Sequence, residues 1–429
     1  MKDILRFLAG AILACGSAAG QQKPYSVYKS YEEMVRAANP KLAAAVPVTR
    51  GPKYHWFSFY DLLEFDPTGR YLLGMEIDFE DRSPRPDDEI GVGAIDLKDG
   101  NRWREIGRTK AWCWQQGCRL QWRRGSTDEV LWNERDGGRF VCRIYNVRTR
   151  QSRIVPRAIY NMAPDGRTAL SYPFERVAFR GYGYEGIPDP FSRQIAPQET
   201  GIFQVDLNTG ESKLIIPVAK IAALRQPDPY PDSFGNLYLM QLEWNPSGSR
   251  FLLFSRRALA PNFGTVVFTA AADGSDIRRI NRDLSHYEWA SDDTMLFWDP
   301  TIDGYGLYKD NGTPPVVLWR APNGHQSYLP QREWVVTDTY PHNGIKHLYL
   351  YHVPTKSFVP LGRFYTPAKY QDELRCDLHP RVSPDGKHIV IDSVHGGDGR
   401  QLYMLDIGFI LDDPPAPENS QKPERAERR

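Results

Sequence analysis

A short pattern of apolar strand, tight turn and second apolar strand recurs along the chain. Each copy is typical of two β-strands joined by a hairpin turn. The four clear copies have a Pro-x-Gly turn and lie at residues 65–73, 162–170, 244–252 and 382–390. Three degenerate copies lie at residues 121–130, 289–296 and 329–335. The chain therefore contains seven copies of one β-hairpin unit.

The spacing of these copies indicates a repeat architecture. Copies recur about 40–55 residues apart, and most are followed by a further strand that closes in a turn, as at residues 94–100 and 203–210. Units of this length with four strands each are typical of propeller blades. The longer interval between Gly166 and Gly248 must hold insertions. We therefore predict an all-β fold with one seven-bladed β-propeller over residues 50–410.

The segments that flank the repeats have different patterns. Residues 1–20 combine Lys2 and Arg6 with an apolar run and then small residues, which is typical of a signal peptide and too short to span a membrane. Cleavage after Gly20 is favoured, and a lipoprotein signal ending at Cys15 is the alternative. We expect an N-terminal extension over 21–49, helical within 27–46, and a disordered tail over 411–429. The mature protein is expected to be secreted or periplasmic, and no other segment is expected to cross a membrane.

Composition narrows the range of partners. The chain has 54 basic and 53 acidic residues, so its net charge attracts no polyanion, and it has no basic stripe for nucleic acid. An anionic ligand must be held by local arginine clusters, and we expect the protein to be a monomer. In an oxidising compartment Cys113 can pair with Cys118 or Cys142, whereas Cys376 is expected to be free or metal-bound.

Two insertions stand out between the third and fourth copies. The first, residues 174–198, alternates glycine with tyrosine and carries Arg176, Arg180, Tyr182 and Tyr184. Aromatic faces and guanidinium forks on a loop suit sugar or carboxylate binding. A structural loop that packs its tyrosines on the blade surface is the alternative. The second insertion, residues 226–236, is rich in proline and acidic residues and shows no candidate chemistry.

Residues 375–381 gather several reactive groups just before the last repeat. If this stretch is extended, Arg375, Asp377 and His379 share one face, and Cys376 and Leu378 share the other. An Asp and a His two residues apart can reach one metal ion. Ion pairing between Asp377 and an arginine is the simpler alternative.

Histidines occupy one place in three successive repeats. His286, His325 and His379 each precede a predicted blade turn. Equivalent inner strands line the axis of a propeller, so these side chains are expected to converge there together with Asp377. This expectation favours the metal site over the simple ion pair.

Several motifs carry a resemblance to a known family. They lie at residues 112–117, 181–184, 324–328, 338–341, 375–386 and 392–397. The mature chain resembles the secreted propeller polysaccharide lyases with TolB-like repeats, in particular the oligogalacturonate lyase and ulvan lyase group. The resemblance implies a manganese-type ion held by His325, Asp377 and His379, with His286 as the catalytic base. Leu374 stands where that family has a glutamine ligand, so Cys376 or His286 is expected to complete the set, and a thiolate would favour zinc.

The ulvan lyases imply a second assignment. By position, Tyr160 and Arg176 match their catalytic tyrosine and arginine. Gln115 and Gln116 stand where a histidine is expected in the second blade. We assign these two glutamines to substrate binding, together with Arg180, Tyr182, Tyr184 and Arg375.

The chemistry that this resemblance implies is β-elimination from a uronate. A cation must neutralise the carboxylate, a base must take the C5 proton, and an acid must protonate the leaving oxygen. We expect Arg176, Arg180 or Arg375 as the cation, and Tyr160, Tyr182 or Tyr184 as the acid. The predicted function is that of a lyase acting on an acidic polysaccharide or oligosaccharide with a bound divalent metal, zinc or manganese. A non-catalytic TolB-like propeller that binds glycans or an envelope protein is the alternative.

Overall fold

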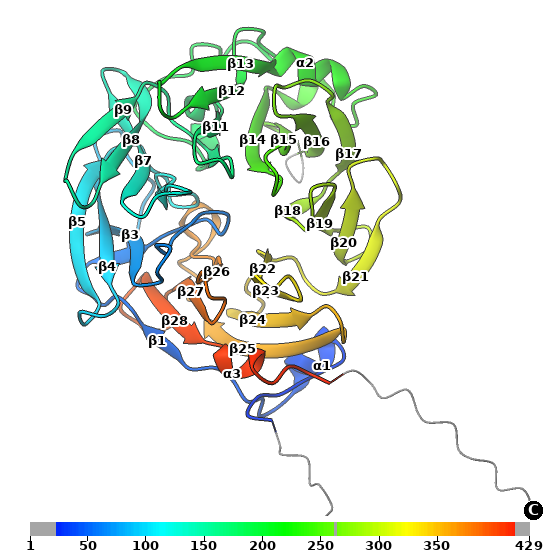
Figure 1. Ribbon diagram of the computed structural model, residues 1–429. Helices are drawn as coiled ribbons and strands as arrows, with labels where there is room; N and C mark the ends of the chain where they lie inside the picture. Colours follow the sequence, from blue (N-terminus) through cyan, green and yellow to red (C-terminus); the bar gives the residue numbers. More distant parts are fainter. Residues whose placement is uncertain (1–22, 261–263, 417–429) are drawn as a thin grey trace, which may run out of the picture.

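The computed structural model describes residues 23–260 and 264–416 and leaves the side chain of Arg180 undescribed. Seven four-stranded antiparallel sheets are arranged in a ring around a central axis (Figure 1). The predicted seven-bladed β-propeller is confirmed. The expected signal peptide, including Cys15, and most of the expected tail lie outside the described residues.

In the first six blades the strands run from the axis to the rim in chain order. Blade one holds β2 (Tyr54–Trp56), β3 (Tyr71–Ile77), β4 (Ile90–Asp96) and β5 (Arg102–Thr109). Blade two holds β6 (Gln121–Trp122), β7 (Glu129–Asp136), β8 (Arg139–Asn146) and β9 (Ser152–Val155). Blade three holds β10 (Asn161–Met162), β11 (Thr168–Ser171), β12 (Gly201–Asp206) and β13 (Ser212–Pro217).

The next three blades follow the same plan. Blade four holds β14 (Leu237–Trp244), β15 (Arg250–Arg257), β16 (Val266–Ala271) and β17 (Arg278–Arg282). Blade five holds β18 (Ser285–Trp289), β19 (Thr294–Asp299), β20 (Gly304–Lys309) and β21 (Val316–Arg320). Blade six holds β22 (Ser327–Tyr328), β23 (Trp334–Asp338), β24 (Ile345–His352) and β25 (Ser357–Tyr365).

The last blade joins the two ends of the chain. It holds β26 (Arg381–Val382), β27 (His388–Ser393), β28 (Gln401–Asp406) and, outermost, β1 (Ala45–Pro47). Strand β1 pairs antiparallel with β28, with Ala45 opposite Leu405. The segment that we expected to be only an N-terminal extension therefore also supplies the strand that closes the ring.

The Pro-x-Gly turns form the inner hairpins because their glycines accept a left-handed backbone. The φ angles are 68° at Gly69, 65° at Gly166, 72° at Gly248 and 75° at Gly386. In three of these turns the residue before the proline also helps: Asp66 Oδ1 accepts a hydrogen bond from the amide of Tyr71 at 2.6 Å, and Asn245 and Ser383 accept in the same way. These local features fix the hairpins before any contact between blades is made.

A buried ion network crosses the junction between the last blade and the first. Arg381, on β26, donates from Nε to Glu64 at 2.8 Å and from Nη2 to Asp392 at 2.8 Å. Asp392, on β27, accepts from the amides of Phe57 and Ser58 in blade one at 3.2 and 2.9 Å. Burial raises the pKa of Glu64 to about 7, against the opposing effect of Arg381. We call Arg381, Glu64 and Asp392 the closure network.

The flanking segments are held against the ring. Helix α1 (Tyr31–Arg36) is shorter than the expected helical stretch and buries Met34 against blade six. Helix α3 (Gly408–Leu411) follows the last blade, and Lys23 donates to Asp413 Oδ1 at 2.6 Å. Contacts with the fold thus extend into the first residues of the expected tail. In the described part of the chain, no helix has the length and apolar character needed to span a membrane.

The expected insertions lie in blade three and between blades three and four. The first joins β11 to β12 and begins with a three-ten helix, η1 (Phe174–Arg180). The second, residues 226–236, follows α2 (Val218–Leu224) and contains the three-ten helix η2 (Asp232–Phe234). A further three-ten helix, η4 (Asp372–Leu374), precedes the last blade.

The pairing that Cys113 could make with Cys118 or Cys142 is not formed. Cys113, Cys118, Cys142 and Cys376 are all buried free thiols. Cys118 Sγ lies 3.6 Å from Met75 Sδ, and Cys113 Sγ lies 4.0 Å from the carbonyl oxygen of Gly117. Instead, these thiols pack in the core as small apolar groups.

Replacing Arg381 by methionine is expected to destabilise the fold by about 3–5 kcal/mol, because it leaves two buried carboxylates without their cation. Urea unfolding monitored by tryptophan fluorescence measures this change. Arg102→Ala is the control, since Arg102 and Asp99 form an exposed pair whose loss costs less than about 1 kcal/mol. Equal stability of both variants would contradict a structural role for the closure network.

Candidate functional site

Three histidines meet beside the axis on one face of the ring. His286 lies on β18, His325 precedes β22, and His379 precedes β26. The ring centroids of His286 and His325 are 4.2 Å apart, and those of His325 and His379 are also 4.2 Å apart. All three side chains are buried. The structure therefore brings together the three histidines that the repeat alignment placed at equivalent positions.

The backbone turns two of these side chains out of the normal strand pattern. φ is 45° at His286 and 43° at His379, values that a residue with a Cβ rarely adopts. The register of β18 with β19 shifts at this point, between Ser285 and Tyr287. Equivalent positions in blades two and four show the same conformation, with φ of 57° at Arg119 and 52° at Gln241. Such strain in inner strands is typical of sites where side chains must be aimed.

His325, Asp377 and His379 form a group that can hold a metal ion, and we call it the metal group. Their ligand atoms lie within 4.8 Å of one another, and all three residues are buried. Asp377 Oδ1 and His379 Nε2 are buried without a hydrogen-bond partner among the described residues. Buried polar atoms without partners are rare, and a bound cation would satisfy both. Two imidazoles and a carboxylate suit zinc or manganese.

Asp338 orients this group from behind. It ends β23 and accepts hydrogen bonds from His325 Nδ1 at 2.9 Å and from the amide of His379 at 3.1 Å. With Nδ1 bound to Asp338, Nε2 of His325 is left to face an ion, as metal-bound histidines require. The close approach depends on Gly324, because a Cβ there would lie 1.8 Å from the carbonyl oxygen of Asp338.

Two cations flank the carboxylate of the group. Arg375 Nε donates to Asp377 Oδ2 at 2.6 Å, and Lys346 Nζ lies 3.9 Å from Oδ1. Burial by itself would raise the pKa of Asp377, but Arg375 and Lys346 outweigh it and hold the pKa well below its usual range. Asp377 is therefore ionised, so both alternatives for this residue apply: it pairs with arginine and still offers an oxygen to a cation.

His286 lies outside the metal group, and its imidazole is neutral. Burial, together with His325, lowers its pKa well below the ordinary value of 6.5. Its Nδ1 lies 2.8 Å from Oδ1 of Asn323, which can only accept, so Nδ1 carries the proton. Nε2 then presents a lone pair and lies 3.4 Å from the hydroxyl of Tyr340. A neutral imidazole beside a phenol can exchange one proton.

A cavity of about 280 Å³ opens onto these groups. We call it the central cavity. Burial raises the pKa of Tyr340 well above its usual value, so this hydroxyl keeps its proton. Tyr182, from the first insertion, accepts a hydrogen bond from Arg375 Nη2 at 2.7 Å. The wall includes the following residues that carry chemistry: His286, His325, Tyr340, Tyr182, Arg375 and Arg256.

Several residues predicted for the site lie elsewhere in the described structure. Arg176 is buried and donates to Asp189 at 2.8 Å and to the carbonyl oxygen of Leu237 at 3.0 Å, so it pins the insertion to blade four. The hydroxyl of Tyr184 accepts from Asn133 at 2.9 Å within the core. The structure brings neither residue to the central cavity. The side chain of Arg180 lies outside the described residues.

The remaining predicted residues take supporting positions. Gln115 donates to the carbonyl oxygen of Arg375 at 2.9 Å and so holds the wall of the metal group. Gln116 donates to the hydroxyl of Tyr160 at 3.2 Å, and that hydroxyl lies 3.4 Å from the hydroxyl of Tyr287, so both residues are in the core. Cys376 points away from the metal group and packs with Tyr370 and Val394, where burial raises its pKa to about 11.

Sequence reasoning assigned no role to Asp338, Tyr340, Asn323 or Arg256. Three of these residues had a usable signal: Asp338 and Tyr340 lie in one of the motifs behind the family resemblance, and Asn323 stands two residues before His325. Arg256 had none. It is the last residue but one of β15 in blade four, and it lines the cavity only because the folded ring brings the blades together.

Comparisons with known proteins agree with this fold. No protein-family model matches the chain, and no curated protein matches its sequence. An oligogalacturonate lyase in complex with manganese superposes with a TM-score of 0.61 at 15% identity, covering 89% of this chain and 96% of that one. An oligogalacturonate lyase from Vibrio parahaemolyticus gives 0.60 at 12%, with the same coverage. TolB from Acinetobacter baumannii gives only 0.37 at 12%, covering 72% and 63%. The first two likenesses show the seven-bladed architecture.

The metal group leads to a direct prediction. After dialysis against manganese or zinc, the purified protein is expected to retain about one ion per chain, and His325→Ala is expected to retain almost none. Elemental analysis measures the ratio. Cys376→Ser should keep the ion, because its thiol lies outside the group, and the exposed His342→Ala serves as the histidine control. Full loading of His325→Ala, or loss in Cys376→Ser, would contradict this site.

The buried histidines also predict a pH dependence of stability. Burial lowers the pKa of His286 and His379 well below 6.5, so the unfolded chain takes up protons that the folded chain refuses. In metal-free buffer the free energy of unfolding should be highest above the ordinary histidine pKa and should fall as the pH drops from about 8 to 5. Urea unfolding across this range tests it. His286→Gln should show a shallower fall than His342→Ala, and equal slopes would contradict the assignment.

Proposed function

We propose that this protein is a lyase that cleaves a uronate-containing acidic polysaccharide or oligosaccharide by β-elimination in the central cavity. The observation that carries the proposal is the contact between a neutral His286 and a protonated Tyr340 at 3.4 Å, beside a group of metal-ligand character and two arginines. The oligogalacturonate lyases with the same fold support this choice of reaction.

The cationic side of the cavity would receive the substrate carboxylate. Arg375 and Arg256 both line it, and a guanidinium binds a carboxylate through paired hydrogen bonds. A divalent ion held by His325, Asp377 and His379 would add positive charge where the enolate of the uronate develops. The weak acidity of the C5 proton is the main obstacle to the reaction, and neutralising the carboxylate lowers the pKa of this proton.

The proton transfers can be assigned to two side chains. Nε2 of His286 takes the C5 proton, and the electron pair forms the C4–C5 double bond as the C4–O bond breaks. The leaving oxygen takes the proton of the Tyr340 hydroxyl. His286 then returns its proton to Tyr340 across their contact, so both groups end as they began. A base that is neutral at pH 7 is ready for this step without prior deprotonation.

The cellular location of the protein is also part of this proposal and is inferred from its sequence. The pattern of residues 1–20 favours export, so we infer that the protein works in the periplasm or outside the cell. Polysaccharides are found there, which fits the proposed substrate. Glycan binding without turnover, the second reading of the fold, is an outcome of the same assay.

The test is the ultraviolet absorbance of an unsaturated uronate product. With manganese or zinc supplied, the wild type is expected to generate it from at least one of polygalacturonate, alginate and ulvan. His286→Ala and Tyr340→Phe should each lower kcat/KM by about 10²–10⁴, whereas His342→Ala should not change it. Absence of product from every uronate polymer would sink the proposal, and binding without product would favour a non-catalytic role.

A further inference from the structure

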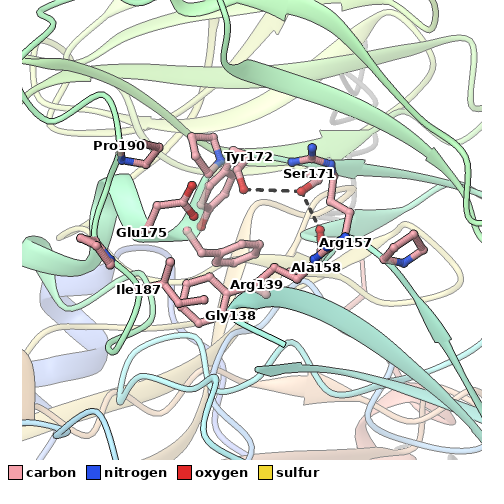
Figure 2. Close-up of a pocket in the computed structure, with 14 residues that line it drawn as sticks. Gly138, Arg139, Arg157, Ala158, Ser171, Tyr172, Glu175, Ile187 and Pro190 are labelled. Atoms are coloured by element: carbon pink, nitrogen blue, oxygen red, sulfur yellow. Dashed lines mark hydrogen bonds between the residues drawn. The ribbon is translucent and has the colours of Figure 1, made fainter. Parts of the chain in front are cut away.

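A second cavity, of about 450 Å³, lies between blades two and three and the first insertion (Figure 2). We call it the rim cavity. Three segments build its wall: the β7–β8 hairpin supplies Arg139, the link between β9 and β10 supplies Arg157, and the start of the insertion supplies Glu175. In Figure 2, Glu175 and Ile187 lie on one side of the cavity and Arg157 lies on the other.

The rim cavity and the central cavity share one structural element. The first insertion gives Tyr182 to the wall of the central cavity, and it gives Glu175 and Ile187 to the wall of the rim cavity. Strand β11 borders the rim cavity, and strand β19 borders the central cavity. Each is the second strand of its blade and runs away from the inner hairpin turn, so both strands end toward the same face of the ring. Both cavities therefore lie toward one face of the ring, and the first insertion contributes to the wall of each.

Only one of the three charged side chains that line the rim cavity, Arg157, is held by its neighbours in the described structure. Neither Arg139 nor Glu175 has a hydrogen bond or ion pair with another described residue. Burial raises the pKa of Glu175, against the opposing effects of its own backbone amide and of the nearby Arg157. Arg157 is held in place, with its guanidinium 3.6 Å from the ring centroid of Phe203 and Nε 3.3 Å from Ser212 Oγ. Leaving a carboxylate partly desolvated costs stability unless a ligand satisfies it.

The rest of the wall is apolar and stiff. Phe140, Tyr172, Pro188 and Pro190 line it, and proline and aromatic side chains lose little conformational freedom when a ligand binds. Such surfaces suit the C–H face of a sugar ring. Two guanidiniums suit a carboxylate, and an acceptor without a partner suits hydroxyl donors.

We propose that the rim cavity is a distal subsite for a further uronate unit of the polysaccharide chain whose cleaved unit occupies the central cavity. A uronate ring carries a carboxylate, several hydroxyls and an apolar face, which are the three features that this wall complements. This inference rests on the proposed function for the identity of its ligand. It adds that long chains bind better than short ones, because only a long chain fills both cavities.

The test compares a polymer with its own trimer. On the polymer that the wild type cleaves, among polygalacturonate, alginate and ulvan, Arg139→Ala and Glu175→Ala are each expected to raise KM about fivefold or more. On the matching trimer, KM and kcat should stay within about twofold of the wild type, because the catalytic groups are untouched. Arg193→Ala is the control, since Arg193 is an exposed cation of the same insertion outside the cavity wall.

Electrophoresis through gels that contain these polymers separates this inference from the proposed function. His286→Ala protein should be retarded as strongly as the wild type, and adding Arg139→Ala should lessen the retardation. That result without any turnover would retain the rim subsite and remove the lyase. Turnover with an unchanged ratio of polymer KM to trimer KM in both rim variants would overturn the subsite and leave the lyase standing.

Discussion

The closure network is the constraint on which the rest of the molecule depends. A propeller becomes a rigid ring only when its last blade is joined to its first, and here a buried guanidinium holds carboxylates from both sides of that junction. Arg381 also donates to the carbonyl oxygens of Leu378 and His379. The residue that closes the ring is thus bonded to the backbone of the metal group. The interaction that joins the last blade to the first therefore also positions the residues of the site.

The site combines groups whose charges are set by opposite means. Burial keeps His286 neutral, whereas flanking cations keep Asp377 ionised although it is just as buried. Asp338 adds orientation, since one carboxylate fixes both the ring of His325 and the backbone of His379. An uncharged base and a charged ligand group can therefore lie side by side in one small volume.

Sequence reasoning succeeded where the information is local or periodic. The Pro-x-Gly turns identified the hairpins, their spacing gave seven blades, and equivalent positions brought His286, His325 and His379 together. It also placed Cys376 on the face opposite Asp377, but the family resemblance then assigned that thiol to the metal. The alternation of an extended strand was the better guide, since the thiol packs with Val394.

The failures concern contacts between segments that no local pattern encodes. Arg176 and Tyr184 have the side chains that a uronate site needs, yet their partners, Asp189 and Asn133, make them structural. The contact between Tyr340 and His286 became visible only in the folded ring. Which side chains meet across blades depends on the packing of the whole ring. A single sequence does not show these contacts directly.

The left-handed residues in the inner strands, or just before them, have a consequence for how such proteins change. Each of these positions presents one side chain from one blade, and the strand beyond it keeps its own core contacts. Blades two and four hold Arg119 and Gln241 where blades five and seven hold His286 and His379. A substitution at one of these positions changes the chemical group that one blade presents. Its cost in stability differs from blade to blade, because the buried Arg119 is paired with Asp61 whereas Oε1 of Gln241 has no hydrogen-bond partner among the described residues.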